Sequence, residues 1–180
     1  SGLVGSEMCI RDSSSIGQYS LAATIAATFY FIPINAYKVL LSSFSGKNLD
    51  DILNKFKTKI FKICFLIVIL QEAIYFTIRI LHNEFLLFPE IFYKTANLLS
   101  ILSIGLLGVW LIEYGALFFA AKQKNWLLNS RSLITFITNI TFNLILIPLY
   151  GINGAALGTT SALILSGGII FFLKKTKTEY

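Results

Sequence analysis

The sequence lacks the residue patterns on which metal sites and soluble enzymes depend. It has 2 cysteines and 1 histidine, and Cys9, Cys64 and His82 stand far apart. A zinc site needs several such ligands at short spacing and a disulfide framework needs paired cysteines, so both are excluded. No P-loop, dinucleotide-binding glycine pattern, zinc-protease motif or nucleophile elbow occurs. We therefore expect no cofactor, no metal and no enzymatic activity.

Charge is scarce as well. Charged residues make up 13% of the chain and hydrophobic residues 56%, with a mean hydropathy of +0.74, whereas soluble proteins have about a quarter of their residues charged. Apolar runs of the roughly 20 residues needed to cross a bilayer recur between short polar breaks. The sequence predicts an all-α integral membrane protein in the lipid bilayer, with no nucleic-acid partner. Five transmembrane helices are expected at about residues 16–44, 60–81, 97–121, 132–149 and 153–173.

The basic residues predict the orientation in the membrane. Most of them fall in connections that five helices would place on one side, whereas Lys94 and Arg79 belong to the other side. The first group consists of Lys47, Lys55, Lys57, Lys59, Lys62, Lys122, Lys124, Arg131, Lys174, Lys175 and Lys177. Lys and Arg are enriched in cytoplasmic loops. We therefore expect a multi-pass protein of the inner (cytoplasmic) membrane with a cytoplasmic C-terminus.

A polar stripe follows the first predicted helix. Its members recur at helical spacing and share one face, with Phe31 filling the one gap. They are Ser20, Thr24, Thr28, Asn35 and Lys38, continued by Ser42. Polar side chains at bilayer depth usually face a protein interior or a water-filled cavity. These side chains are therefore substrate-cavity candidates, and packing against polar partners is the alternative.

The fourth predicted helix repeats the pattern. Its polar residues are Ser132, Thr135, Asn139 and Asn143, supplemented by Thr138 and Thr141. Hydroxyl and amide side chains commonly hold membrane helices together by hydrogen bonds. We expect such a polar network here, and the alternative is that the stripe lines a cavity.

Four charged side chains are expected within the membrane. Lys38 lies near the predicted cytoplasmic end, where it either extends its ammonium group to the interface or binds a ligand. Glu72 and Arg79 share one face, as a structural charge pair or a polar wall. Glu113 is the best candidate for a coupling-ion or proton site, with a structural carboxylate as the alternative.

The last predicted helix carries a ridge of small residues. Gly154, Gly158 and Ala162 recur every four residues and so share one face. Such ridges allow two helix backbones to approach closely in a membrane. The ridge predicts helix packing.

The first residues, "SGLVGSEMCIRDS", fit no signal peptide, because the charged "GSEMCIRD" interrupts any apolar core of one. Residues 3–12 resemble the translated adapter of a transposon-based short-read sequencing library without a mismatch. We therefore interpret residues 1–13 as adapter-derived and expect no structure there. Residues 14–180 are interpreted as the C-terminal transmembrane bundle of a longer protein whose N-terminal bundle is missing.

The stretch "NLILIPLYGINGAALGTTSA", residues 143–162, resembles the polysaccharide (O-antigen type) flippases. Their superfamily also contains lipid II flippases and multidrug and toxin extrusion transporters. A second match is "IGQYSLAATIAATFYFIP" at residues 16–33, and a third, weaker match is "PEIFYKTANLLSIL" at residues 89–102. The residues that carry the main match are Asn139, Asn143, Leu146, Ile147, Pro148, Gly151, Gly154, Ala155, Ala156 and Thr159.

The resemblance implies a fold and a function. The five helices would form most of one six-helix bundle of a transporter with twelve or more helices. Such a transporter flips an oligosaccharide linked to polyprenyl pyrophosphate by alternating access, for surface polysaccharide synthesis. Its partners would be this lipid-linked oligosaccharide, the bilayer and the missing N-terminal bundle. Many relatives carry a basic cavity residue where this chain has Thr24, and Lys38 on the same stripe is the candidate substitute.

Two alternatives remain open. A cation-coupled multidrug exporter of the same superfamily would use Glu113 as its coupling site. A membrane polysaccharide polymerase or glycosyltransferase belongs to another class, and it usually needs a large external loop with catalytic residues. The predicted outer loops, about residues 82–96 and 150–153, are short.

Overall fold

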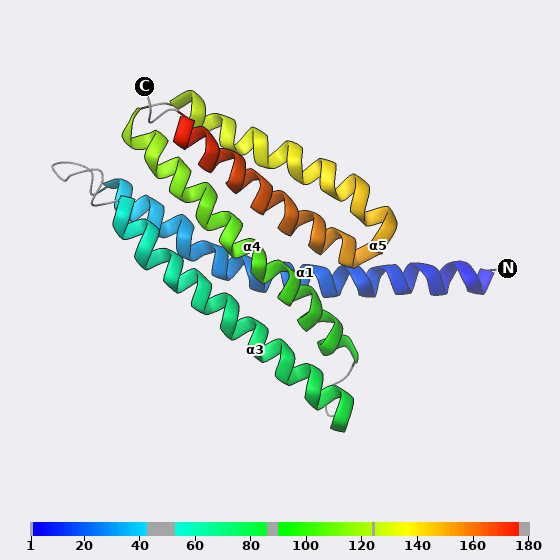
Figure 1. The fold of residues 1–180 in the computed structure, drawn as a ribbon. Helices are drawn as coiled ribbons and strands as arrows, with labels where there is room; N and C mark the ends of the chain where they lie inside the picture. Colours follow the sequence, from blue (N-terminus) through cyan, green and yellow to red (C-terminus); the bar gives the residue numbers. More distant parts are fainter. Residues whose placement is uncertain (1, 43–52, 86–89, 124, 177–180) are drawn as a thin grey trace.

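The computed structural model describes residues 2–42, 53–85, 90–123 and 125–176. Within these ranges the chain forms helices and no strand, as Figure 1 shows. The elements are α1 (Gly2–Ser42), the short π-helix η1 (Phe56–Ile60), α3 (Phe61–Phe85), α4 (Glu90–Ala121) and α5 (Asn125–Thr176). The predicted all-α class is confirmed.

Among the residues that the structure describes, four helices are long and apolar enough to cross a membrane. They are Ser15–Ser42, Leu53–His82, Glu90–Ala121 and Trp126–Leu173. The expected count of five separate helices is not found, because residues 132–149 and 153–173 both lie in α5. The two predicted helices are joined through Gly151, whose φ of 56° and ψ of −129° are the non-helical values inside α5. Glycine tolerates a positive φ, so a single residue replaces the expected loop.

At Gly151 the chain turns back on itself, and the two parts of α5 lie side by side in opposite directions (Figure 1). We call residues 125–150 the first arm and residues 152–176 the second arm. Thr138 of the first arm and Ser166 of the second share a hydrogen bond of 2.7 Å. α5 is therefore a helical hairpin, made of two antiparallel arms joined at Gly151.

Three helices begin earlier than the sequence predicts. α4 begins at Glu90 rather than near residue 97, and α5 begins at Asn125 rather than near residue 132. α1 includes residues 2–13, for which the sequence predicts no structure. Hydropathy detects only the apolar part of a helix, whereas backbone hydrogen bonding continues into polar residues. Helix bounds are therefore wider than apolar runs.

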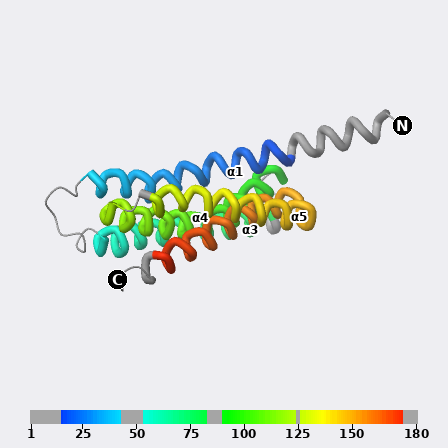
Figure 2. The backbone as a smooth tube through the Cα atoms, turned by 90° about the horizontal axis from the view of Figure 1, so that it is seen from above, coloured from blue at the N-terminus to red at the C-terminus, as the bar shows by residue number. Residues whose placement is uncertain are grey.

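α4 is the centre of the fold. In its most apolar stretch 56% of the residues are buried, compared with 17% for α1 and for the α3 span. In Figures 1 and 2 α4 runs beside both α5 and α3. A Cβ added at Gly108 would lie 2.6 Å from the backbone carbon of Leu163, so α4 and the second arm touch backbone to backbone. α4 is therefore the helix against which the other helices of the bundle pack.

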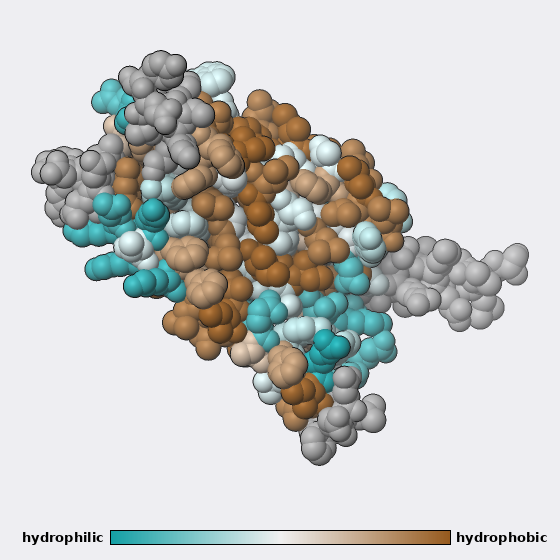
Figure 3. Space-filling model, viewed as in Figure 1, coloured by the Kyte–Doolittle hydropathy of each residue, from teal (hydrophilic) through white to brown (hydrophobic). Residues whose placement is uncertain are grey.

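The outer surface is apolar where lipid would cover it. Large side chains such as Phe31, Phe76 and Leu144 are mostly exposed on α1, α3 and the first arm. Figure 3 shows apolar surface across the middle of the molecule and hydrophilic patches toward its two ends. An exposed apolar band between polar ends is the pattern of a membrane-spanning surface.

Candidate functional site

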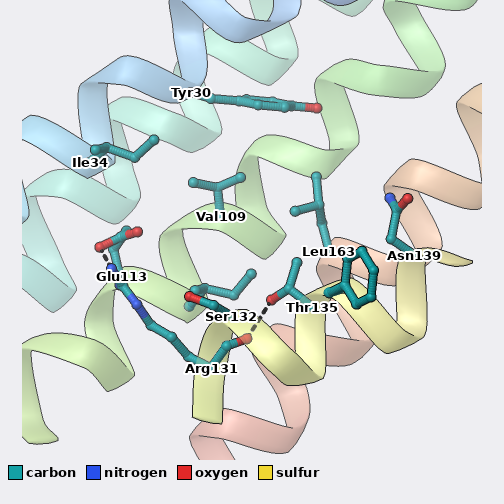
Figure 4. Close-up of a pocket in the computed structure, with 11 residues that line it drawn as sticks. Tyr30, Ile34, Val109, Glu113, Arg131, Ser132, Thr135, Asn139 and Leu163 are labelled. Atoms are coloured by element: carbon teal, nitrogen blue, oxygen red, sulfur yellow. Dashed lines mark hydrogen bonds and ion pairs between the residues drawn. The ribbon is translucent and has the colours of Figure 1, made fainter. Parts of the chain in front are cut away.

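A cavity of about 560 Å³ lies between α1, α4 and both arms of α5 (Figure 4). This volume falls within the range of small-molecule sites. α1 contributes Tyr30 and Ile34, while the second arm contributes Leu163. The remaining lining residues are Val109, Ile112, Glu113, Arg131, Ser132, Thr135, Phe136 and Asn139. Polar groups therefore gather on α4 and the first arm, against an apolar background.

An ion pair joins α4 to the first arm inside this cavity. Arg131 Nη1 donates to Glu113 Oε2 at 2.9 Å. The side chain of Glu113 is 9% exposed and that of Arg131 is 24% exposed, so the arginine is the more accessible partner. At 1.5 Å per residue, Glu113 lies about 12 Å from the end of α4 and Arg131 about 9 Å from the start of α5. The pair is thus within reach of the membrane surface at that end.

α1 completes the surroundings of the ion pair. The Arg131 guanidinium lies 5.5 Å from the centre of the Tyr37 ring, in a cation–π contact. Lys38, one residue further along, is close enough to attract Glu113 electrostatically. Three basic or aromatic groups from two helices therefore surround one carboxylate.

The first arm adds hydroxyl and amide groups. Thr135 Oγ1 donates to the backbone oxygen of Arg131 at 2.9 Å, and Asn143 Nδ2 donates to Asn139 Oδ1 at 2.8 Å. A second hollow of about 310 Å³ runs along this arm and shares Asn139 with the cavity. The polar stripe predicted on this segment is thus divided. Ser132, Thr135 and Asn139 line the cavity, while Thr138 bonds to the second arm.

The candidates on α1 lie outside this cavity. Ser20, Thr24, Thr28 and Lys38 are exposed and Asn35 is half-buried. The side chains of Thr24, Thr28 and Asn35 donate to carbonyl oxygens of α1 itself. The stripe therefore turns away from the rest of the bundle.

Glu72 and Arg79 do not form an ion pair with each other in the described part of the chain. Glu72 accepts hydrogen bonds from the hydroxyls of Ser100 (2.7 Å) and Ser103 (2.9 Å) of α4. Arg79 is exposed on α3, and no ion pair to it is found among the described residues. Beside Glu72, the amide of Gln71 is buried with no hydrogen-bond partner in the described part of the chain. Glu72 therefore belongs to the α3–α4 interface rather than to the cavity.

The small residues of the second arm face the first arm. A Cβ at Gly154 would collide with the Leu146 carbonyl group, and one at Gly158 would lie 2.5 Å from Asn143 Oδ1. Ala162 is fully buried. These positions set the close spacing of the two arms.

The sequence did not identify two polar side chains of the site, Arg131 and Tyr30, as cavity residues. Arg131 was assigned only to a basic connection, and Tyr30 fell between members of the polar stripe. Tyr30 donates its hydroxyl hydrogen to the Leu102 backbone oxygen and so ties α1 to α4. A lone arginine just inside an apolar run, 18 residues after a lone glutamate, was the available signal for the ion pair.

Within the described residues, no group of three or more His, Cys, Asp or Glu side chains is placed to hold a metal ion. In comparisons with known proteins, no protein-family model, curated protein or solved structure matches the chain.

Proposed function

We propose that this chain is the C-terminal bundle of a transporter that flips polyprenyl-pyrophosphate-linked oligosaccharide across the cytoplasmic membrane by alternating access. The observation that carries the proposal is the cavity with Arg131, hydroxyls and amides, set in a bundle with an apolar outer surface. A pyrophosphate headgroup needs basic and hydroxyl donors, while its lipid tail can remain in the bilayer. The resemblance of residues 143–162 to polysaccharide flippases supports the same conclusion.

In this proposal each arm of α5 crosses the membrane. An arm of about 25 residues is roughly 37 Å long at 1.5 Å per residue, which exceeds the hydrocarbon thickness. Five crossings then place the basic connections and the tail in the cytoplasm. The exposed stripe on α1 would face the N-terminal bundle across the central cavity. Lys38 would lie at the border between this stripe and the cavity around Arg131.

The alternative of a cation-coupled drug exporter has less support. Glu113 would have to be free for a coupling cation, but it is already bonded to Arg131. An anionic substrate has a ready partner in Arg131 in this cavity, whereas a cationic drug would meet the positive charge of Arg131. We therefore favour the flippase.

Complementation tests the proposal. The complete gene, recovered from an uninterrupted genomic contig, is expressed in a flippase-deficient strain that makes the matching glycan. Arg131→Gln and Lys38→Ala should lower surface polysaccharide even after correction for the amount of each variant protein in the membrane. Lys94→Gln removes a basic residue outside the cavity and should complement normally. Full complementation by Arg131→Gln would contradict the proposal.

A second measurement concerns the 180-residue chain alone. In this proposal half of the cavity wall comes from the N-terminal bundle. The isolated chain should therefore not translocate lipid-linked oligosaccharide in vesicles. Translocation by this chain would show that the bundle is complete in itself.

A further inference from the structure

The only ion pair that lines the cavity in the described part of the chain is formed before any ligand enters. Glu113 and Arg131 form a neutral pair, and the other titratable groups that face Glu113 are Lys38 and Tyr37 of α1. An anion that binds Arg131 would compete with the Glu113 carboxylate for the same guanidinium. Its binding therefore disturbs the charge balance of the pair.

Arg131 is arranged to accept a second anion. Its guanidinium has five N–H donors, and one is engaged by Glu113. The side chain is 24% exposed on the cavity wall, whereas Glu113 is nearly covered. An entering anion therefore reaches the arginine directly, while the carboxylate stays buried.

A buried carboxylate that loses its partner is costly in a membrane protein. Removing one member of a buried ion pair leaves an uncompensated charge, and ionised side chains at membrane depth are unfavourable. Uptake of a proton removes this cost. Because Glu113 lies close to the end of α4, the aqueous phase at that end can supply this proton.

We propose that binding of a pyrophosphate diester at Arg131 is coupled to uptake of one proton by Glu113. The ion pair breaks, Arg131 binds the diester oxygens, and a proton from the adjacent aqueous side bonds to a Glu113 carboxylate oxygen. No electrons are transferred, and the site gains one anionic group and one proton. The inference rests on the proposed function only for the identity of the anion.

The test uses the 180-residue chain in phosphatidylcholine nanodiscs and the dimethyl diester of pyrophosphate as the probe. The two charges of this diester do not titrate near neutral pH, so any pH dependence of binding belongs to the protein. Isothermal titration calorimetry from pH 6 to pH 9 measures the affinity. Coupling to one proton should weaken binding by up to tenfold for each pH unit as the pH rises, because the required proton becomes scarcer.

The variants separate the two roles. Glu113→Gln should bind the diester more tightly than the parent protein at pH 8, with little pH dependence, because neither competition nor proton uptake remains. Arg131→Gln should lose at least tenfold in affinity. The double variant Glu113→Gln/Arg131→Gln leaves no buried charge at the pair, so it should stay folded and still fail to bind. Glu90→Gln and Lys94→Gln change the exposed ion pair of the same helix and should bind like the parent protein.

Several results would overturn the inference. They are pH-independent binding or no binding by the parent chain, unchanged pH dependence in Glu113→Gln, and normal binding by the folded double variant. Loss of diester binding in phosphatidylglycerol nanodiscs would also overturn it, because an ordinary lipid phosphate would then be the ligand. Proton-coupled diester binding combined with failed polysaccharide complementation would instead reject the flippase and retain the coupling.

Discussion

α4 makes two different interfaces. Toward α5 it has a cavity, a buried ion pair and a backbone contact at Gly108. Toward α3 its serine hydroxyls satisfy the Glu72 carboxylate. On the side that opens to a cavity, the carboxylate is paired with an arginine. On the packed side, the carboxylate accepts hydrogen bonds from neutral hydroxyls. Only the first arrangement has a cationic partner that an entering anion can share.

The largest loss of stability is expected when the ion pair is halved. Arg131→Gln leaves the Glu113 carboxylate buried without a cation, which costs about 3–5 kcal/mol for buried pairs. Unfolding in mixed micelles with increasing dodecyl sulfate, followed by circular dichroism, measures the free energy of unfolding. Glu113→Gln/Arg131→Gln should recover most of the loss. Equal losses in the single and double variants would show that packing of Arg131, not its charge, matters.

A smaller loss is expected where α4 touches the second arm. Gly108→Ala places a methyl group 2.6 Å from the Leu163 backbone, and overpacking of this kind costs about 2–3 kcal/mol. Gly168→Ala is the matched control, because no atom lies within 4 Å of a Cβ there. The same unfolding assay compares them. A difference near zero would mean that the two helices separate at little cost.

The α3 side is expected to be less sensitive. Ser100→Ala/Ser103→Ala removes both hydroxyl donors from Glu72, which should cost about 1–2 kcal/mol. Ser130→Ala removes a hydroxyl that bonds only within its own helix, and it should have little effect on the free energy of unfolding. A loss as large as that of Arg131→Gln would erase the contrast between the two interfaces.

The smallest effect is expected for Tyr75→Phe. The Tyr75 hydroxyl donates to Asn97 Oδ1 at 3.2 Å in a half-buried position, so its loss should cost under about 1 kcal/mol. Tyr150→Phe, at an exposed position beside the turn of α5, is the control. If Tyr75→Phe lowers the free energy of unfolding more than Ser100→Ala/Ser103→Ala does, then Tyr75 rather than Glu72 contributes most to the α3–α4 interface.

The sequence predicted helices more reliably than their partners. The apolar runs predicted the positions of the long helices. An apolar run in a bilayer forms a helix because its backbone groups must bond within the segment itself. The same runs predicted the two arms of α5 as separate helices, and the turn residues predicted a loop between them at residues 150–153. Gly151 alone makes the reversal, and hydropathy carries no information about a single dihedral angle.

The site was less predictable than the fold. Asn139 and Glu113 were recognised as polar residues at depth, and the cavity includes both. Tyr30 and Ile34 are the α1 residues that line the cavity, and the polar stripe of α1 faces outward. Spacing defines a stripe on a helix, but the rotation of that helix depends on packing against its neighbours. Arg131 was missed for the same reason.

The turn at Gly151 gives the two arms of α5 different contacts with α4. Gly108 and Gly115 of α4 and Gly167 of the second arm mark close contacts, and all three lie between α4 and the second arm. The first arm packs closely on the second arm at Gly154 and Gly158, and it reaches α4 across the cavity through the ion pair of Arg131 with Glu113. Opening the ion pair therefore removes this connection between the first arm and α4, while the second arm stays packed on α4.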